Sequence, residues 1–213
     1  MEKLFKGIAR FRHEDFEVHR ELFRELGRKQ QPHTLFIGCS DSRVVPELIT
    51  RTRPGELFMI RNIANIVPPY RQTHEFAATT AAIEYAVEVL NVAAIVVCGH
   101  SNCGGCAALH QDPKTLQHIP NVARWLEISQ EVKARVARQM VEGTPEEQEW
   151  LTEQINILVQ MRNLLTYPYI RRRYEAGRIE VLGWYYIIET GEIFNFNDQT
   201  ENFELITAPA VGP

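Results

Sequence analysis

The chain has 213 residues, of which 23 are basic and 27 acidic, and its net charge of −4 argues against a nucleic-acid-binding protein. The hydrophobic fraction of 45% is typical of a globular protein with a buried core, and no stretch reaches the roughly 20 apolar residues of a membrane span. Residues 1–12 mix charged and apolar side chains, unlike the apolar centre of a signal peptide, so we expect a cytoplasmic protein.

The N-terminal segment 2–27 is predicted to be helical. Its apolar residues recur at spacings of three and four, which place them on one face of a helix: Leu4, Phe5, Ile8, Phe11, Leu22, Phe23 and Leu26. Because this segment precedes the strands and helices that follow, we expect residues 1–30 to form a helical arm that packs on the core or on a partner subunit.

Residues 31–213 are predicted to form a single core in which strands alternate with helices. Short apolar runs predict strands at 34–39, 57–60, 93–98, 179–188 and 193–196. Helices are predicted at 76–90 and at 122–165, with a break in the second near Gly143-Thr144-Pro145. This alternation indicates the α/β class, with a mostly parallel central sheet flanked by helices.

Two clusters of metal-ligating residues fall at the ends of predicted strands. Cys39 ends the first strand, and His100 and Cys103 follow the third. In open α/β sheets the ligand crevice lies beyond the carboxyl ends of the strands, so these three side chains are expected to meet. Two thiolates and an imidazole suit zinc, and three protein ligands leave a fourth position open, as in catalytic sites. The sequence therefore predicts one Zn²⁺ per chain.

Cys106 offers two other interpretations of the same region. It could supply a fourth ligand, which would close the site and make the zinc structural. Cys103-Gly104-Gly105-Cys106 also has the C-x-x-C spacing of a thioredoxin-type redox motif. Neither interpretation gives a role to the nearby Asp41 and Arg43, and we favour a buried hydrophobic role for Cys106.

Asp41 and Arg43 are predicted to be catalytic residues beside the metal. Arg43 would orient Asp41, and Asp41 would accept a hydrogen bond from the zinc-bound water or hydroxide. Hydroxide on zinc is the nucleophile that such a site provides near neutral pH. An ordinary surface ion pair between the two residues is the alternative.

The motifs Cys-x-Asp-x-Arg at 39–43 and His-x-x-Cys at 100–103 resemble those of the β-class carbonic anhydrases. The resemblance covers nearly the whole chain and includes Gly55-Glu56-Leu57-Phe58, Arg61-Asn62-Ile63-Ala64-Asn65, Val67-Pro68-Pro69-Tyr70, Ile83-Glu84-Tyr85-Ala86-Val87 and Gly183-Trp184. It implies a zinc enzyme that hydrates CO2 reversibly to bicarbonate and a proton, by attack of zinc-bound hydroxide. It also implies a homodimer or a higher oligomer of dimers.

Within that family the chain is more similar to the plant-like branch, which includes bacterial and cyanobacterial members. That likeness assigns the substrate pocket to Gln30, Phe58 and Tyr85, with Gln31 as a neighbouring candidate for Gln30. The carboxamide would donate a hydrogen bond to a substrate oxygen, and the two rings would form an apolar wall. A loop glutamine and core aromatic residues are the alternative.

Two other functions stay open at this point. The same zinc chemistry hydrolyses carbonyl sulfide or carbon disulfide in relatives of the family, and parallel assays would separate these activities. A non-catalytic, zinc-stabilised scaffold is the other alternative, although the Asp41–Arg43 pair argues against it. The sequence also leaves open the proton shuttle, the oligomer size and any association with a carboxysome.

The thiolate ligands predict an alkaline pH dependence. Two thiolates cancel the double positive charge of zinc, so bound water should ionise less readily than beside three neutral imidazoles. We expect CO2 hydration to increase from neutral to alkaline pH, measured as a pH–rate profile. A profile that stays flat down to about pH 6 would contradict this expectation.

Overall fold

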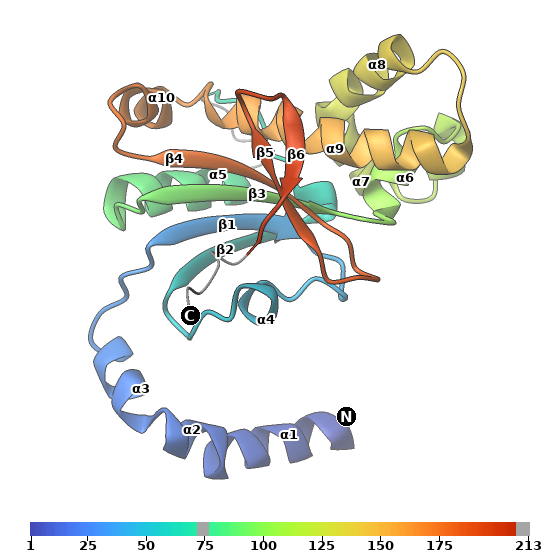
Figure 1. The fold of residues 1–213 in the computed structure, drawn as a ribbon. Helices are drawn as coiled ribbons and strands as arrows, with labels where there is room; N and C mark the ends of the chain where they lie inside the picture. Colours follow the sequence, from blue (N-terminus) through green and yellow to red (C-terminus); the bar gives the residue numbers. More distant parts are fainter. Residues whose placement is uncertain (72–76, 208–213) are drawn as a thin grey trace, which may run out of the picture.

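The computed structural model describes residues 1–71 and 77–207, and a six-stranded sheet in the order β2-β1-β3-β4-β5-β6 runs through it (Figure 1). Its strands are β1 (Thr34–Cys39), β2 (Leu57–Asn62), β3 (Ala94–His100), β4 (Glu180–Tyr186), β5 (Ile193–Asn197) and β6 (Asn202–Leu205). The first four are parallel, and β5 and β6 are antiparallel. The predicted mostly parallel sheet is confirmed, and β6 is an additional strand.

The two faces of the sheet are covered unequally. Leu35 and Ile37 of β1 pack into a core with helices on one face, whereas Phe36 between them packs on the opposite face, as the two-residue period of a strand requires. The first face is covered by α5 (Ala77–Glu84), α9 (Pro145–Leu164) and α10 (Pro168–Glu175), and the short α4 (Pro46–Thr50) lies on the second. Helix α5 continues as a π-helical turn, Tyr85–Val89, and residue 76 of the predicted helix lies outside the described residues.

The predicted helical region 122–165 is divided into several helices. These are α7 (Pro120–Leu126), the 3-10 turn η4 (Glu127–Ser129), α8 (Gln130–Gln139) and α9. The predicted break is confirmed, because Thr144 caps α9 in a capping box with Glu147 and Pro145 follows at the first helical position. Shorter helical segments complete this side of the molecule: η1 (Ile63–Asn65), α6 (Gly104–Ala108) and η3 (Pro113–Leu116). None of the described helices combines the length and apolar character that crossing a bilayer requires.

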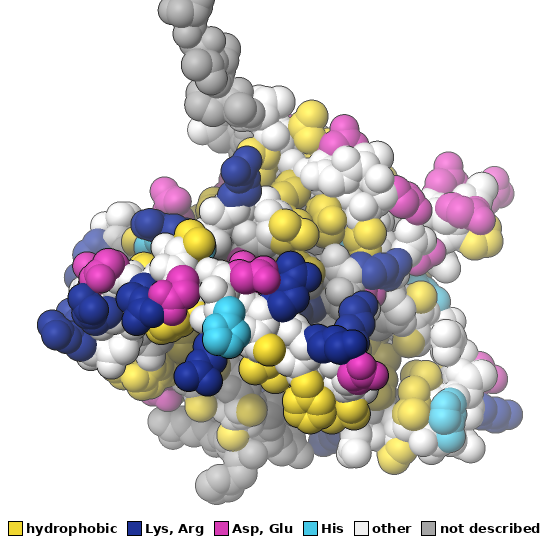
Figure 2. All heavy atoms as spheres, turned by 90° about the horizontal axis from the view of Figure 1, so that it is seen from below, with side chains coloured by type: hydrophobic (Ala, Val, Ile, Leu, Met, Phe, Trp, Pro, Cys, Tyr) yellow, Lys and Arg dark blue, Asp and Glu magenta, His cyan; other side chains and the backbone are white. Residues whose placement is uncertain are grey.

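The N-terminal arm consists of three helices where a continuous one was predicted: α1 (Glu2–His13), α2 (Asp15–Val18) and α3 (Arg20–Leu26). The φ angle departs from its usual helical value at Glu14 (−112°) and His19 (−106°). The arm bends there, and the rings of Phe11, Phe16 and Phe23 form one cluster. The arm extends away from the sheet (Figure 1), and apolar side chains are visible among its charges from below (Figure 2). The exposed apolar residues of α1 include Leu4, Phe5, Ile8 and Phe11.

The strand order creates a crevice between β1 and β3. The chain leaves β1 for β2 on one side of it and then crosses to β3 on its other side. The connections beyond the carboxyl ends of β1 and β3 therefore diverge, which is where open α/β sheets bind ligands.

Candidate metal centre

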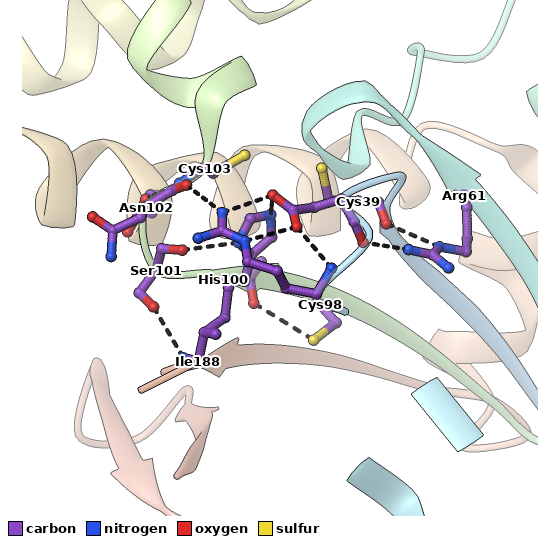
Figure 3. A network of polar contacts seen from close by, with 12 residues as sticks. Cys39, Arg61, Cys98, His100, Ser101, Asn102, Cys103 and Ile188 are labelled. Carbon is purple, nitrogen blue, oxygen red and sulfur yellow. Dashed lines mark hydrogen bonds and ion pairs between the residues drawn. The ribbon is translucent and has the colours of Figure 1, made fainter. Parts of the chain in front are cut away.

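The three predicted metal ligands come together in this crevice (Figure 3). Cys39 is the last residue of β1, and His100 is the last residue of the neighbouring strand β3. A tight turn, in which Asn102 takes a left-handed conformation with φ of 56°, then leads to Cys103 at the start of α6. The parallel sheet and one turn thus bring Cys39 close to His100 and Cys103, which lie more than 60 positions later in the sequence, at the carboxyl edge of the sheet.

The ligand atoms of Cys39, His100 and Cys103 all lie within 4.8 Å of one another, and all three residues are buried. Within residues 1–71 and 77–207 this is the only group of three or more His, Cys, Asp or Glu side chains with such spacing. Neither Cys106 nor Asp41 contributes an atom to it. The arrangement therefore provides three protein ligands and does not place Cys106 as a fourth.

The chemistry of the group fits a zinc ion. His100 Nδ1 lies 2.9 Å from the Ser101 carbonyl oxygen, which can only accept, so Nδ1 carries the proton and Nε2 presents a lone pair. That Nε2 atom is buried and has no hydrogen-bond partner. A hydrogen bond with Cys103, together with burial, raises the pKa of the Cys39 thiol to about 12. A divalent cation would satisfy the lone pair and favour the thiolates.

Asp41 lies beside this group and is held by Arg43. Arg43 Nε donates to Asp41 Oδ1 at 2.9 Å and Arg43 Nη2 donates to Asp41 Oδ2 at 2.7 Å, and the Arg43 backbone N–H also donates to Oδ1. The guanidinium hydrogen bonds keep the pKa of Asp41 far below its usual range. Asp41 Oδ2 is 3.9 Å from His100 Nε2, so an anionic carboxylate borders the metal group.

Two arginines fix the backbone on which the ligands stand (Figure 3). Arg61 of β2 donates to the carbonyl oxygens of Cys39 and Asp41, at 3.0 and 2.5 Å. Arg43 Nη2 donates at 2.9 Å to the carbonyl oxygen of Asn102, in the turn before Cys103. The segments that carry the two cysteines are therefore tied to each other through Arg43.

Comparisons with known proteins identify the family of this chain. Residues 34–193 match the family described as carbonic anhydrase. A carbonic anhydrase of Helicobacter pylori (strain ATCC 700392 / 26695) is 41% identical over 207 residues, which cover 96% of this chain and 94% of that protein. The structure of the β-carbonic anhydrase CcaA shares 39% identity and a TM-score of 0.92, over 97% of this chain and 99% of that chain. The chain belongs to the β-carbonic anhydrase family.

A further neighbour is one of two tetrameric β-carbonic anhydrases from Sordaria macrospora. It has a TM-score of 0.81 and 31% identity, over 92% of this chain and 96% of that chain. The resemblance to β-carbonic anhydrases, first seen in the ligand motifs, is thus confirmed over nearly the whole chain.

The three predicted substrate-pocket residues lie at the other end of the sheet in this β-carbonic anhydrase. Phe58 of β2 pairs with Leu35, four residues before Cys39, which is about 13 Å along the strand. The rings of Phe58 and Tyr85 are 6.0 Å apart, so these two residues do meet. Gln30 is exposed and precedes β1. Within one chain, Phe58 and Tyr85 therefore contact each other and lie apart from the metal group.

A buried glutamate beside the metal group was not predicted from the sequence. Glu153 of α9 accepts a hydrogen bond from the Cys103 backbone N–H and another from the Tyr185 hydroxyl, both at 2.7 Å. Burial raises the pKa of Glu153 to about 7. A lone glutamate in a helix is normally solvent-facing. Its spacing from Asn156, Gln160 and Asn163 was the available signal, because all four lie on one buried stripe of α9.

Proposed function

We propose that this β-carbonic anhydrase interconverts CO2 and bicarbonate with one Zn²⁺ per chain, held by Cys39, His100 and Cys103. The buried His100 Nε2, which has no partner and faces two buried cysteines, is the observation that supports this most strongly. The named relatives are carbonic anhydrases over almost their full length, which supports the same reaction. Zinc content and CO2 hydration measured on the same sample test the proposal.

Zinc, when bound, supplies Lewis acidity that makes hydroxide available as a nucleophile near neutral pH. The contribution of Asp41 is orientation: its carboxylate accepts a hydrogen bond from the attacking oxygen and so directs a lone pair toward the carbon of CO2. Arg43 keeps Asp41 anionic and fixed by two side-chain hydrogen bonds. Because Asp41 is held in place before the reaction, little reorganisation is needed when substrate arrives.

We also propose that Gln30, Phe58 and Tyr85 act on the metal group of a second copy of this chain. Within one chain the aromatic pair lies at the amino end of β2 and the metal ligands at the carboxyl ends of β1 and β3. Tyr85 is 43% exposed, as a residue that meets a partner would be in one isolated chain. In a symmetric homodimer the same pairing forms two complete sites.

The N-terminal arm supports such a dimer. Its α1 helix carries exposed apolar side chains and stands away from the sheet of its own chain. A helix with an uncovered apolar face gains stability by burying it against another subunit. We propose that the arm, residues 1–30, binds a second copy of the chain. The core of residues 31–213 forms the rest of the dimer, and higher oligomers are built from such dimers. The cytoplasmic location expected from the sequence stays a prediction for cell fractionation to test.

Mixing two inactive variants tests the shared site. Cys39→Ser lacks the metal, and the double variant Phe58→Ala/Tyr85→Ala lacks the apolar wall, so each homodimer should be nearly inactive. After the two are unfolded and refolded together, half of the dimers should be mixed and contain one intact site, giving about a quarter of parental activity. If mixing restores no activity although mixed dimers form, the pocket is not shared between chains.

A further inference from the structure

One peptide unit beside the metal group is held from both sides. The peptide that joins Asn102 to Cys103 accepts a hydrogen bond on its carbonyl oxygen from Arg43 Nη2 at 2.9 Å (Figure 3). Its N–H donates to Glu153 Oε1 at 2.7 Å. Asn102 is in the left-handed region, which asparagine adopts more readily than most non-glycine residues. The two hydrogen bonds to Arg43 and Glu153 then fix the orientation of the peptide that follows it.

Glu153 is itself fixed by its surroundings. It is 2% exposed, and its second carboxylate oxygen accepts a hydrogen bond from the Tyr185 hydroxyl of β4 at 2.7 Å. Helix α9 approaches the sheet closely at this level because β3 has Gly99 there. A Cβ atom at that position would lie only 2.8 Å from Ile157 Cδ1 of α9. The carboxylate is therefore set by the packing of α9 on β3 and β4.

The position of the Cys103 thiol depends on this peptide. Cys103 precedes α6, so its N–H points away from that helix and finds its acceptor on α9 instead. A carboxylate buried without a cation is costly in itself, and Glu153 is compensated by two donors, one of which is the backbone of a metal ligand. The Glu153 side chain thus links α9 to the metal group by a hydrogen bond.

We propose that Glu153 is a positioning residue, which places the Cys103 thiolate for zinc by accepting the hydrogen bond from the Cys103 N–H. This rests on the proposed zinc site and extends it to α9, a helix that holds no ligand. Some residues hydrogen-bond to a metal ligand without binding the metal themselves. Removing such a residue typically weakens metal binding by about 10- to 100-fold. This role requires the length of the Glu153 side chain, which we call its reach, and does not require its negative charge.

Three substitutions separate these properties. Glu153→Asp keeps the charge and shortens the side chain, whereas Glu153→Gln keeps the reach, can accept from Cys103 and can donate to Tyr185. Gln160→Asn is the matched control: Gln160 is another fully buried α9 residue that accepts a backbone hydrogen bond, from Val67 at 2.8 Å, but it does not contact a ligand. Zinc affinity is measured by competition with a chelator, and the Co²⁺-substituted proteins are compared by absorption spectroscopy.

We expect Glu153→Asp to bind zinc about 10- to 100-fold more weakly and to shift the Co²⁺–thiolate bands, while Glu153→Gln stays within about threefold of the parent. Gln160→Asn should lose thermal stability and keep parental affinity and spectrum. Parental affinity in Glu153→Asp, equal weakening in Gln160→Asn, or equal weakening in Glu153→Gln would each overturn the positioning role. A parent protein without zinc, or with zinc and no CO2 hydration, would instead overturn the proposed function.

Discussion

Cys39→Ser, His100→Ala and Cys103→Ser are each expected to lose zinc and CO2 hydration together, with activity reduced by more than about 10³-fold. Each change removes one of only three protein ligands, and two ligands do not hold zinc in a defined geometry. Metal content is measured by atomic absorption and activity by stopped flow on the same samples.

Two other buried cysteines provide matched controls for the ligand variants. Cys98 of β3 packs with Phe36 and Val96 and is not part of the ligand group, so Cys98→Ala should keep its zinc. Cys106→Ser should also keep zinc and activity, because Cys106 is not part of the ligand group. Zinc loss in Cys106→Ser would contradict the three-ligand site, and full activity in Cys39→Ser would contradict the metal assignment altogether.

Asp41→Asn is expected to keep zinc and to lose about 10²- to 10³-fold in turnover. Arg43 donates to both carboxylate oxygens of Asp41, and an amide nitrogen in either place would face a donor instead of accepting from it. The side chain would therefore leave its present position and no longer orient the nucleophile. The measurement is the steady-state rate of CO2 hydration at matched zinc content.

The exposed Asp198 in the turn after β5 provides the control, because Asp198→Asn makes the same chemical change far from the metal ligands in the sequence and should leave turnover unchanged. Parental turnover in Asp41→Asn would refute the orienting role. A fall in zinc content in Asp41→Asn would show that the carboxylate is a ligand, contrary to the geometry in which both of its oxygens bind Arg43.

The parts of the fold that could be predicted are those whose sequence pattern matches their burial. Strand β1 is buried along its whole length, and a short apolar run that follows a proline is typical of such a strand. Strand β6, Asn202–Leu205, is mostly exposed and carries polar residues, so its sequence resembles a loop. The bends in the N-terminal arm accompany contacts among Phe11, Phe16 and Phe23, which helical periodicity does not reveal.

Some residues of the site could likewise be predicted from the sequence, and others could not. Cys39, His100 and Cys103 could be predicted because zinc restricts ligands to a few residue types and parallel strands bring their ends together. The separation of Phe58 and Tyr85 from these ligands follows from strand register, which a motif does not encode. Glu153 was missed because its role comes from packing between α9 and β3, and its spacing from Asn156, Gln160 and Asn163 indicates a polar stripe on α9 without showing that the stripe is buried.

The central claim is that one chain holds one zinc and uses it to hydrate CO2. The most direct test is zinc per chain together with stopped-flow CO2 hydration, on protein kept reduced and never exposed to chelator. We expect about one zinc per chain and rapid turnover that increases toward alkaline pH. Protein without zinc, or zinc-replete protein inactive at both neutral and alkaline pH, would contradict it.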